Sequence, residues 1–101
     1  MGGYMQPQGH VQLLINLLDL GMNPQAALDA PRWRWDGGKT VSVEPGFPVD
    51  LAQALARKGH DICPALDEVG FGRGQFILRN ASDGVLAGGS DPRTDGEVAI
   101  L

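Results

Sequence analysis

The sequence predicts an α+β fold, a single domain over residues 1–101 in which helices pack on antiparallel strands. Three observations carry this prediction. Apolar residues recur at helical spacing over residues 9–20, and apolar and polar residues alternate over 32–35 and again over 39–44. Further along the chain, the pattern predicts one more helix and then further strands. With 43% hydrophobic and 20% charged residues, the composition is that of a globular protein with a modest core.

The first two helices follow each other closely. Over 9–20 the apolar stripe is so wide that it covers most of the circumference, and a helix of this kind must be covered on more than one side. Gly21 stands where a glycine ends a helix. Asn23 and Pro24 are typical of an N-cap and a first helical residue. This second helix should stop before Pro31, because the residue preceding a proline avoids the α region.

The middle of the chain predicts a hairpin followed by a third helix. In a strand over 32–35, Trp33 and Trp35 share one face, and Val41 and Val43 share the inward face of a strand over 39–44. The turn is expected at 36–38, which reads Asp-Gly-Gly. Residues 48–60 have a helical pattern that ends at Gly59. Residues 74–80 and 84–89 flank a turn and predict a second hairpin, and 90–101 could add a last strand.

Charge and cysteine content exclude several classes of function. The net charge is −4 and the pI is near 4.8, which argues against nucleic-acid binding. One cysteine allows no internal disulfide and no structural zinc set. The apolar run over 11–20 contains Gln12, Asn16 and Asp19, so it is not expected to span a membrane. It also lacks the pattern of a signal peptide. We therefore expect no membrane partner and favour a cytoplasmic location for this chain.

Three patterns could carry chemistry, but none of them is specific. The GFGRG segment at 70–74 resembles a phosphate loop, but a strand follows it, which favours a turn. His10, His60 and Cys63 could bind zinc or form a thiol–imidazole pair, although their spacing matches no known set. Arginine and tryptophan alternate over 32–35 as in single-strand nucleic-acid binders. A packed Trp face with a solvated Arg face explains the same alternation and suits the acidic chain better.

The hydroxyl side chains show no nucleophile signature, because no His-plus-carboxylate pattern lies near them. They are Thr40, Ser42, Ser82, Ser90 and Thr94. Composition, periodicity and spacing by themselves therefore predict an α+β domain without a self-contained active site.

A longer pattern is more specific. The stretch MGGYMQPQGHVQLLINLLDLGMNPQAALDAPRWRW resembles the C-terminal part of the small subunit of the γ-glutamyltransferase (γ-glutamyltranspeptidase) family. The likeness continues, in the family's order, through VSVEPGF, LARKGHDI, GRGQFILR and GVLAGGSDPRTDG. The combined GG, QPQ, APR and SDPR series is far more specific than any one of its parts.

The resemblance implies a fold, an activity and two site residues. Family members are N-terminal-nucleophile hydrolases with a four-layer αββα sandwich, of which this chain would form part. A precursor cuts itself, and the newly exposed threonine attacks a γ-glutamyl amide of the glutathione type. The glutamyl group then passes to water or to an amino acid or peptide, without a metal or organic cofactor. The family's Gly-Gly pair, which matches Gly2 and Gly3, supplies oxyanion-hole amides.

The resemblance also shows what the chain does not match. No stretch matches the family's nucleophilic threonine segment, its substrate-binding serine pair or its large-subunit arginine, and Tyr4 stands where this bacterial branch often has an acidic residue. Met1 coincides with a methionine inside the branch's own motif. We therefore expect a C-terminal fragment, inactive alone, whose parent could be periplasmic. The alternative is a non-catalytic, partner-binding module. The expected partner is the remainder of the parent or a second copy, since the first helix is apolar around most of its surface.

Overall fold

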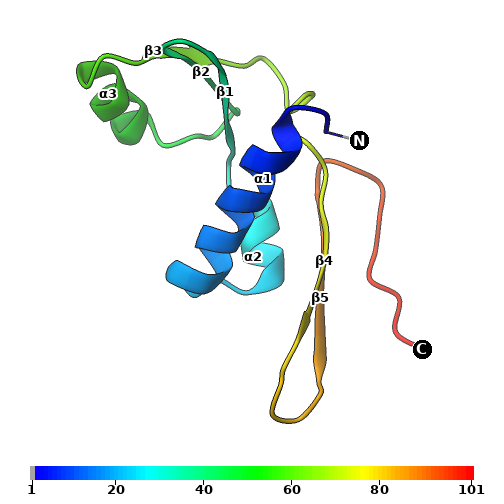
Figure 1. Cartoon of the computed structure of the whole chain (residues 1–101). Coiled ribbons are helices and arrows are strands. Elements are labelled where there is room, and N and C mark those ends of the chain that lie inside the picture. The colour runs from blue at the N-terminus through cyan, green and yellow to red at the C-terminus, as the bar shows by residue number, and fades with distance from the viewer. Residues whose placement is uncertain (1) are drawn as a thin grey trace. The chain divides into compact units, whose positions relative to one another are not determined.

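The computed structural model describes residues 2–101 and confirms the α+β class. Figure 1 shows the helices and strands along the chain, whose residues form two compact units. The first contains residues 2–9 and 31–72, and the second contains 10–30 and 73–101. The helices are α1 (Met5–Leu14), α2 (Pro24–Asp29) and α3 (Val49–Arg57), with a π-helical turn, η1 (Ile15–Asp19), after α1. The strands are β1 (Trp33–Gly37), β2 (Thr40–Val43), β3 (Asp61–Pro64), β4 (Gln75–Arg79) and β5 (Leu86–Ser90).

The first unit is built on a three-stranded sheet in the order β1-β2-β3. The β1–β2 hairpin is the predicted one, and Val41 and Val43 are buried as expected. Strand β3 was not predicted; it runs parallel to β2 and pairs Val41 with Ile62. Parallel strands need a crossover, and α3 supplies it. The predicted last strand is wrong, because no strand is assigned over 91–101.

The first helix begins earlier than its apolar pattern indicates. It starts at Met5 and includes Pro7, which lies in the first turn, where helix amides have no partner within the helix. Its end widens into the π turn, in which the Leu20 amide donates to the Ile15 carbonyl over 3.0 Å. Gly21 then turns the chain in the left-handed conformation (φ +66°), as predicted.

The second unit packs α2 against the β4–β5 hairpin. The Asn23 side chain accepts a hydrogen bond from the Ala26 amide (2.8 Å), and Pro24 is the first helical residue, which confirms the predicted cap. Close packing on β5 requires Gly89. A Cβ there would lie 3.0 Å from both Leu28 Cδ1 and the Pro24 backbone. Leu28 is fully buried at this contact.

Candidate active site

The Gly2-Gly3 pair forms a turn that opens helix α1. Both residues have positive φ, +91° and +47°, a conformation that glycine adopts at little cost. Their carbonyls accept hydrogen bonds from the amides of Met5 (2.8 Å) and Gln6 (3.2 Å). Within residues 2–101, the amides of Gly2 and Gly3 donate to no acceptor. The turn therefore presents N–H donors at a helix N-terminus, which carries partial positive charge.

Gln8 joins this first turn of α1 to the free edge of β1. Its side-chain amide accepts from the Trp35 N–H (2.7 Å) and donates to the Trp35 carbonyl (3.2 Å). One side chain thus replaces a neighbouring strand for Trp35. It follows that the Gly-Gly turn is held next to β1.

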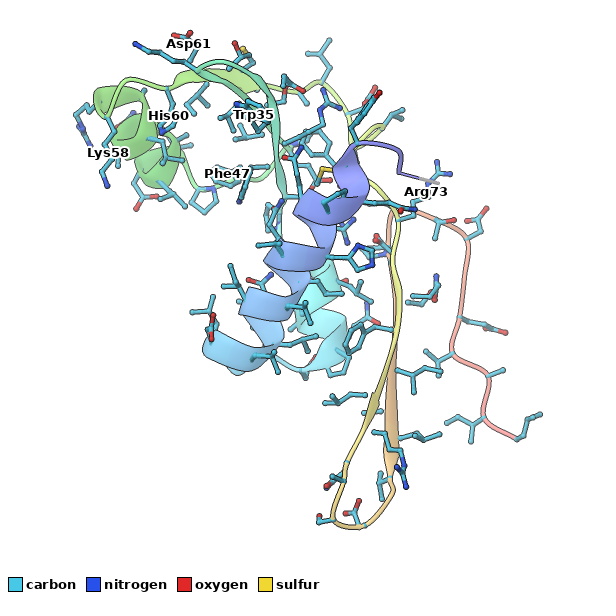
Figure 2. All side chains as sticks on the ribbon, in the orientation of Figure 1. Trp35, Phe47, Lys58, His60, Asp61 and Arg73 are labelled. Atoms are coloured by element: carbon cyan, nitrogen blue, oxygen red, sulfur yellow. The ribbon has the colours of Figure 1, made fainter. Side chains whose placement is uncertain are left out.

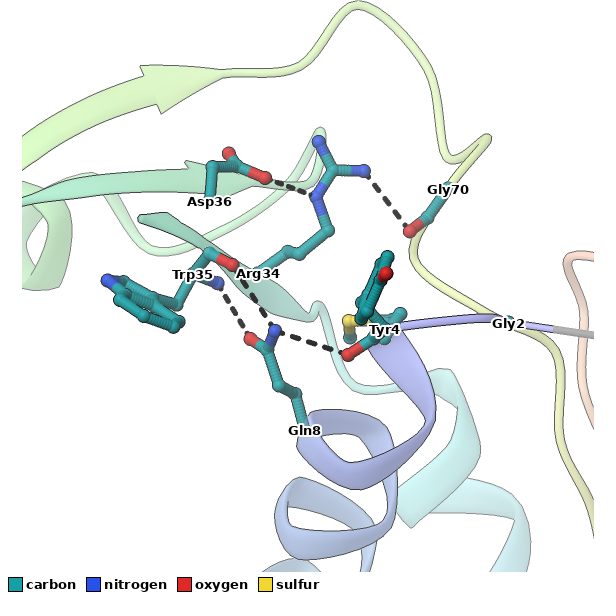
Figure 3. Close-up of a pocket in the computed structure, with 8 residues that line it drawn as sticks. Gly2, Tyr4, Gln8, Arg34, Trp35, Asp36 and Gly70 are labelled. Carbon is teal, nitrogen blue, oxygen red and sulfur yellow. Dashed lines mark hydrogen bonds and ion pairs between the residues drawn. The ribbon is translucent and has the colours of Figure 1, made fainter. Parts of the chain in front are cut away.

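A cavity of about 600 Å³ lies between this turn, β1 and the 70–72 loop, all within the first unit (Figure 3). Its lining residues are Gly2, Tyr4, Met5, Gln8, Arg34, Trp35, Asp36 and Gly70. Tyr4 is almost fully exposed beside the glycine pair. The cavity therefore combines backbone donors with one cation, one carboxylate and two aromatic side chains.

Arg34 and Asp36 form the charged part of the lining. Arg34 Nε lies 2.6 Å from Asp36 Oδ1, and the Ser42 hydroxyl donates to Asp36 Oδ2 over 2.5 Å. The hydrogen bond from Ser42 and then that from Arg34 hold the pKa of Asp36 below its ordinary value of 3.8. Asp36 is therefore ionised at neutral pH and keeps the Arg34 guanidinium in place.

The expected assignment of the β1 faces is wrong. Trp33 and Trp35 are 37% and 54% exposed, whereas Arg32 is buried. Arg32 donates to the carbonyls of Phe71 (3.2 Å) and Gly72 (3.0 Å), and Phe71 is fully buried. The arginine side of the strand packs because the 70–72 loop supplies carbonyl acceptors and a ring beside it.

The other candidate patterns do not form a site in the described part of the chain. Residues 70–74 form a turn with positive φ at Gly70 and Gly72, as favoured, and β4 follows. His60 lies where α3 leads into β3 (Figure 2), and Cys63 is exposed. Within residues 2–101 no three His, Cys, Asp or Glu side chains come together as a metal site would need. No helix over these residues is long and apolar enough to cross a membrane.

Sequence reasoning missed the roles of four residues: Gln8, Arg34 and Asp36 line the cavity, and Ser42 holds Asp36 in place. The Arg-x-Asp spacing at 34–36 is a signal for an ion pair on one strand face, since residues two apart share a face. Gln8 gives no comparable signal, because its partner lies 27 residues away.

Comparisons with known proteins identify relatives of this chain. The model of the gamma-glutamyltranspeptidase protein family matches residues 1–101 of this chain. The glutathione hydrolase-like YwrD proenzyme of Bacillus subtilis is 34% identical, and the match covers 94% of this chain but 19% of that protein. The glutathione hydrolase proenzyme of Escherichia coli is 37% identical, with 83% of this chain and 14% of that protein covered. The chain thus spans less than a fifth of these relatives.

A solved structure extends the comparison to the fold. The cephalosporin acylase from Bacillus halodurans matches with a TM-score of 0.94 and 67% identity, covering 98% of this chain and 18% of that one. This likeness agrees with the expected partial N-terminal-nucleophile hydrolase sandwich. Because the family match extends over the whole sequence and the fold agrees, the chain belongs to the gamma-glutamyltranspeptidase family.

Proposed function

We propose that this chain is the C-terminal part of an enzyme that cleaves γ-glutamyl-type amides, in which Gly2 and Gly3 form part of the oxyanion hole. One observation carries the proposal: the adjacent amides of Gly2 and Gly3 have no acceptor within residues 2–101, and Gly2 lines a cavity. When a nucleophile attacks the amide carbon, the carbonyl oxygen becomes an oxyanion. Fixed N–H donors stabilise it as the charge develops.

The substrate class is an amide that also carries a carboxylate. Glutathione and cephalosporins, which the names of the relatives mention, both have this chemistry. After the amine leaves with a proton, the acyl-enzyme passes its acyl group to water or to an amino acid. The attack needs a side-chain nucleophile and no cofactor. We place the nucleophilic threonine in the part of the longer protein that precedes this segment, so the isolated chain should be inactive.

The test is a chimera in which residues 2–101 replace the matching segment of the Bacillus halodurans acylase. We expect the chimera to cleave itself, which a gel detects, and to hydrolyse a chromogenic γ-glutamyl anilide or a cephalosporin amide. The isolated 101-residue chain serves as the control and should release no chromophore. A chimera that is folded and self-cleaved but hydrolyses neither amide contradicts the proposal. That result favours a non-catalytic module.

We also propose a partner surface along residues 11–20. Five apolar side chains there are substantially exposed: Val11, Leu14, Ile15, Leu18 and Leu20. In a longer protein the remainder of the enzyme would cover them, and in the isolated chain a second copy would. Burial of apolar area stabilises association by about 25 cal/mol per Å² before entropy is subtracted. Light scattering should give a mass well above 10.7 kDa, and Leu18→Glu should lower it. A folded monomer of the unmodified chain would exclude the second copy.

A further inference from the structure

Arg34 differs from the other arginine on its side of β1. Arg32 is 8% exposed and donates to loop carbonyls. The Arg34 side chain is 33% exposed and lines the cavity that Gly2 also lines. Its Nε donates to Asp36 and its Nη1 to the Gly70 carbonyl (3.2 Å), while Nη2 donates to no group within residues 2–101. In Figure 3 no dashed line joins this third nitrogen to the other residues drawn.

The guanidinium is held in place before any ligand arrives. Asp36, itself fixed by Ser42, holds Nε, and the Phe71 ring lies under the guanidinium carbon at 5.3 Å from its centroid. Gly70 leaves the space that Nη1 occupies, because a Cβ there would lie 2.6 Å from it. A cation fixed by an acid, a carbonyl and a ring loses little conformational entropy when it binds an anion.

We propose that Arg34 is a carboxylate-binding residue of the substrate cavity, with Asp36 and Ser42 as its positioning residues. The inference rests on the proposed function and names the group that holds the substrate's carboxylate. Planar guanidinium and carboxylate groups match in geometry, and their hydrogen bonds are stronger than neutral ones. Because Asp36 neutralises the net charge, recognition comes from the free donors of Arg34. That carboxylate belongs either to the acyl half of the amide or to its leaving half.

A purely structural role is the competing explanation, since Arg34 also connects β1 to the 70–72 loop. A connecting arginine is expected to use its donors within the protein, as Arg32 does with two loop carbonyls. Arg34 instead keeps a nitrogen free at a cavity wall. The two explanations differ in what Arg34→Gln changes. Loss of a connection affects all substrates alike, whereas loss of a binding group affects only those with the carboxylate.

The experiment uses the chimera and two matched pairs of substrates. In the first pair, γ-glutamyl-4-nitroanilide is compared with its α-carboxamide, which removes the carboxylate from the acyl half. In the second, γ-glutamyl-3-carboxy-4-nitroanilide is compared with the plain nitroanilide, which removes it from the leaving half. Arg34→Gln should raise KM about tenfold or more for the carboxylate member of one pair, with kcat changed less than about threefold. The pair affected identifies the half that Arg34 binds.

Two further variants and one binding measurement distinguish a binding role of Arg34 from a purely structural one. Arg34→Lys keeps the charge but loses the planar fork, so its KM should be intermediate, and it decides the question if Arg34→Gln does not fold. Arg57→Gln, on α3 and outside the cavity lining, should leave both pairs unchanged. Calorimetry with succinate and with neutral succinamide should show binding of succinate that Arg34→Gln weakens.

Equal KM changes within both pairs, together with unaltered succinate binding, would overturn the inference while hydrolysis still supports the proposed function. Conversely, a chimera that hydrolyses no amide but binds succinate through Arg34 would overturn the proposed function and leave the carboxylate site standing.

Discussion

The two compact units share two hydrogen-bonding arrangements, one made by an arginine and one by a glutamine, but the consequences differ between the units. Each has a buried arginine that follows a proline and donates to backbone carbonyls. Arg32 donates to Phe71 and Gly72 in the first unit, and Arg93 donates to Leu28 (2.8 Å) and Ala30 (3.2 Å) in the second. Arg93 thereby satisfies carbonyls at the end of α2, which have no partner within the helix. Arg32 fixes a loop beside the cavity.

Each unit also uses a glutamine to complete the edge of a strand. Gln8 pairs with both backbone groups of Trp35, and Gln25 pairs in the same way with Ser90 (2.9 and 3.0 Å). Similar hydrogen bonding therefore stabilises both units. The first unit differs in that Nη2 of Arg34 and the amides of Gly2 and Gly3 donate to no acceptor within residues 2–101. The proposed function depends on these donors, which the fold holds in place without giving them an acceptor.

The largest expected effect is the loss of the buried ion pair in the second unit. Asp91 accepts hydrogen bonds from the Gly74 amide (2.7 Å) and from Arg93, and the Asp91 and Arg93 side chains are 0% and 4% exposed. Asp91→Ala removes the carboxylate from beside the buried guanidinium of Arg93, which should destabilise the chain by about 3–5 kcal/mol. Urea unfolding, monitored by hydrogen exchange of the backbone amides in β4 and β5, measures this change. Asp91→Asn keeps an acceptor and should therefore destabilise the chain less. A decrease in the free energy of unfolding below about 1 kcal/mol for Asp91→Ala would contradict the stabilising role of the Asp91–Arg93 ion pair.

The second effect tests the two glycines at helix ends, one in each unit. In the chimera, Gly3→Val should lower kcat by about 10²–10³ with a smaller change in KM, because it displaces an oxyanion donor from its left-handed conformation. Gly21→Val introduces comparable backbone strain away from the Gly2-Gly3 turn and should leave kcat near normal. Gly3→Asn should retain more activity, since asparagine tolerates this conformation. Rates are compared only for self-cleaved protein, and a normal kcat there contradicts the role of Gly3.

A smaller effect distinguishes the role of Gln8 from that of Gln25. Gln8→Ala and Gln25→Ala each remove two hydrogen bonds to a strand edge and should each destabilise the chain by roughly 1–3 kcal/mol. Gln8→Ala should additionally lower kcat/KM of the chimera, because it loosens the turn that carries Gly2 and Gly3. Gln8→Glu keeps the acceptor for the Trp35 amide, so its kcat/KM should lie between those of the unmodified chimera and Gln8→Ala. Equal kcat/KM values for Gln8→Ala and Gln25→Ala would mean that the Gln8 contact does not position the site.

The features predicted from sequence were those with local causes. The Asn23–Pro24 cap, the turn at 36–38 and the inward Val41 and Val43 depend on neighbouring residues. Strand β3 has only four residues, ends at a proline, and depends on parallel pairing with a distant strand. The burial of Arg32 is decided by carbonyls 39 and 40 residues away, so alternation alone could not indicate which face of β1 packs. Gly2 and Gly3 were assigned by resemblance, and their role stays a prediction.

The smallest effect concerns the pH range over which Arg34 stays in position. The hydrogen bond from Ser42 and then that from Arg34 lower the pKa of Asp36, so folding favours its charged form. The contribution of this carboxylate to stability is therefore fully present above the unfolded-state pKa, near 3.9, and is lost as the pH falls through the lower folded value. NMR titration of the Asp36 carboxyl should give a midpoint below 3.8.

Ser42→Ala removes the largest cause of the shift and should move that midpoint upward, toward the ordinary value. Ser90→Ala is the matched change in the second unit, where the Ser90 hydroxyl is the one buried side-chain nitrogen or oxygen within residues 2–101 found without a hydrogen-bond partner. It should leave the Asp36 midpoint unchanged and alter stability little, because no hydrogen bond is lost. An Asp36 midpoint at or above 3.8 in the unmodified chain would contradict the network that holds Arg34 at the cavity.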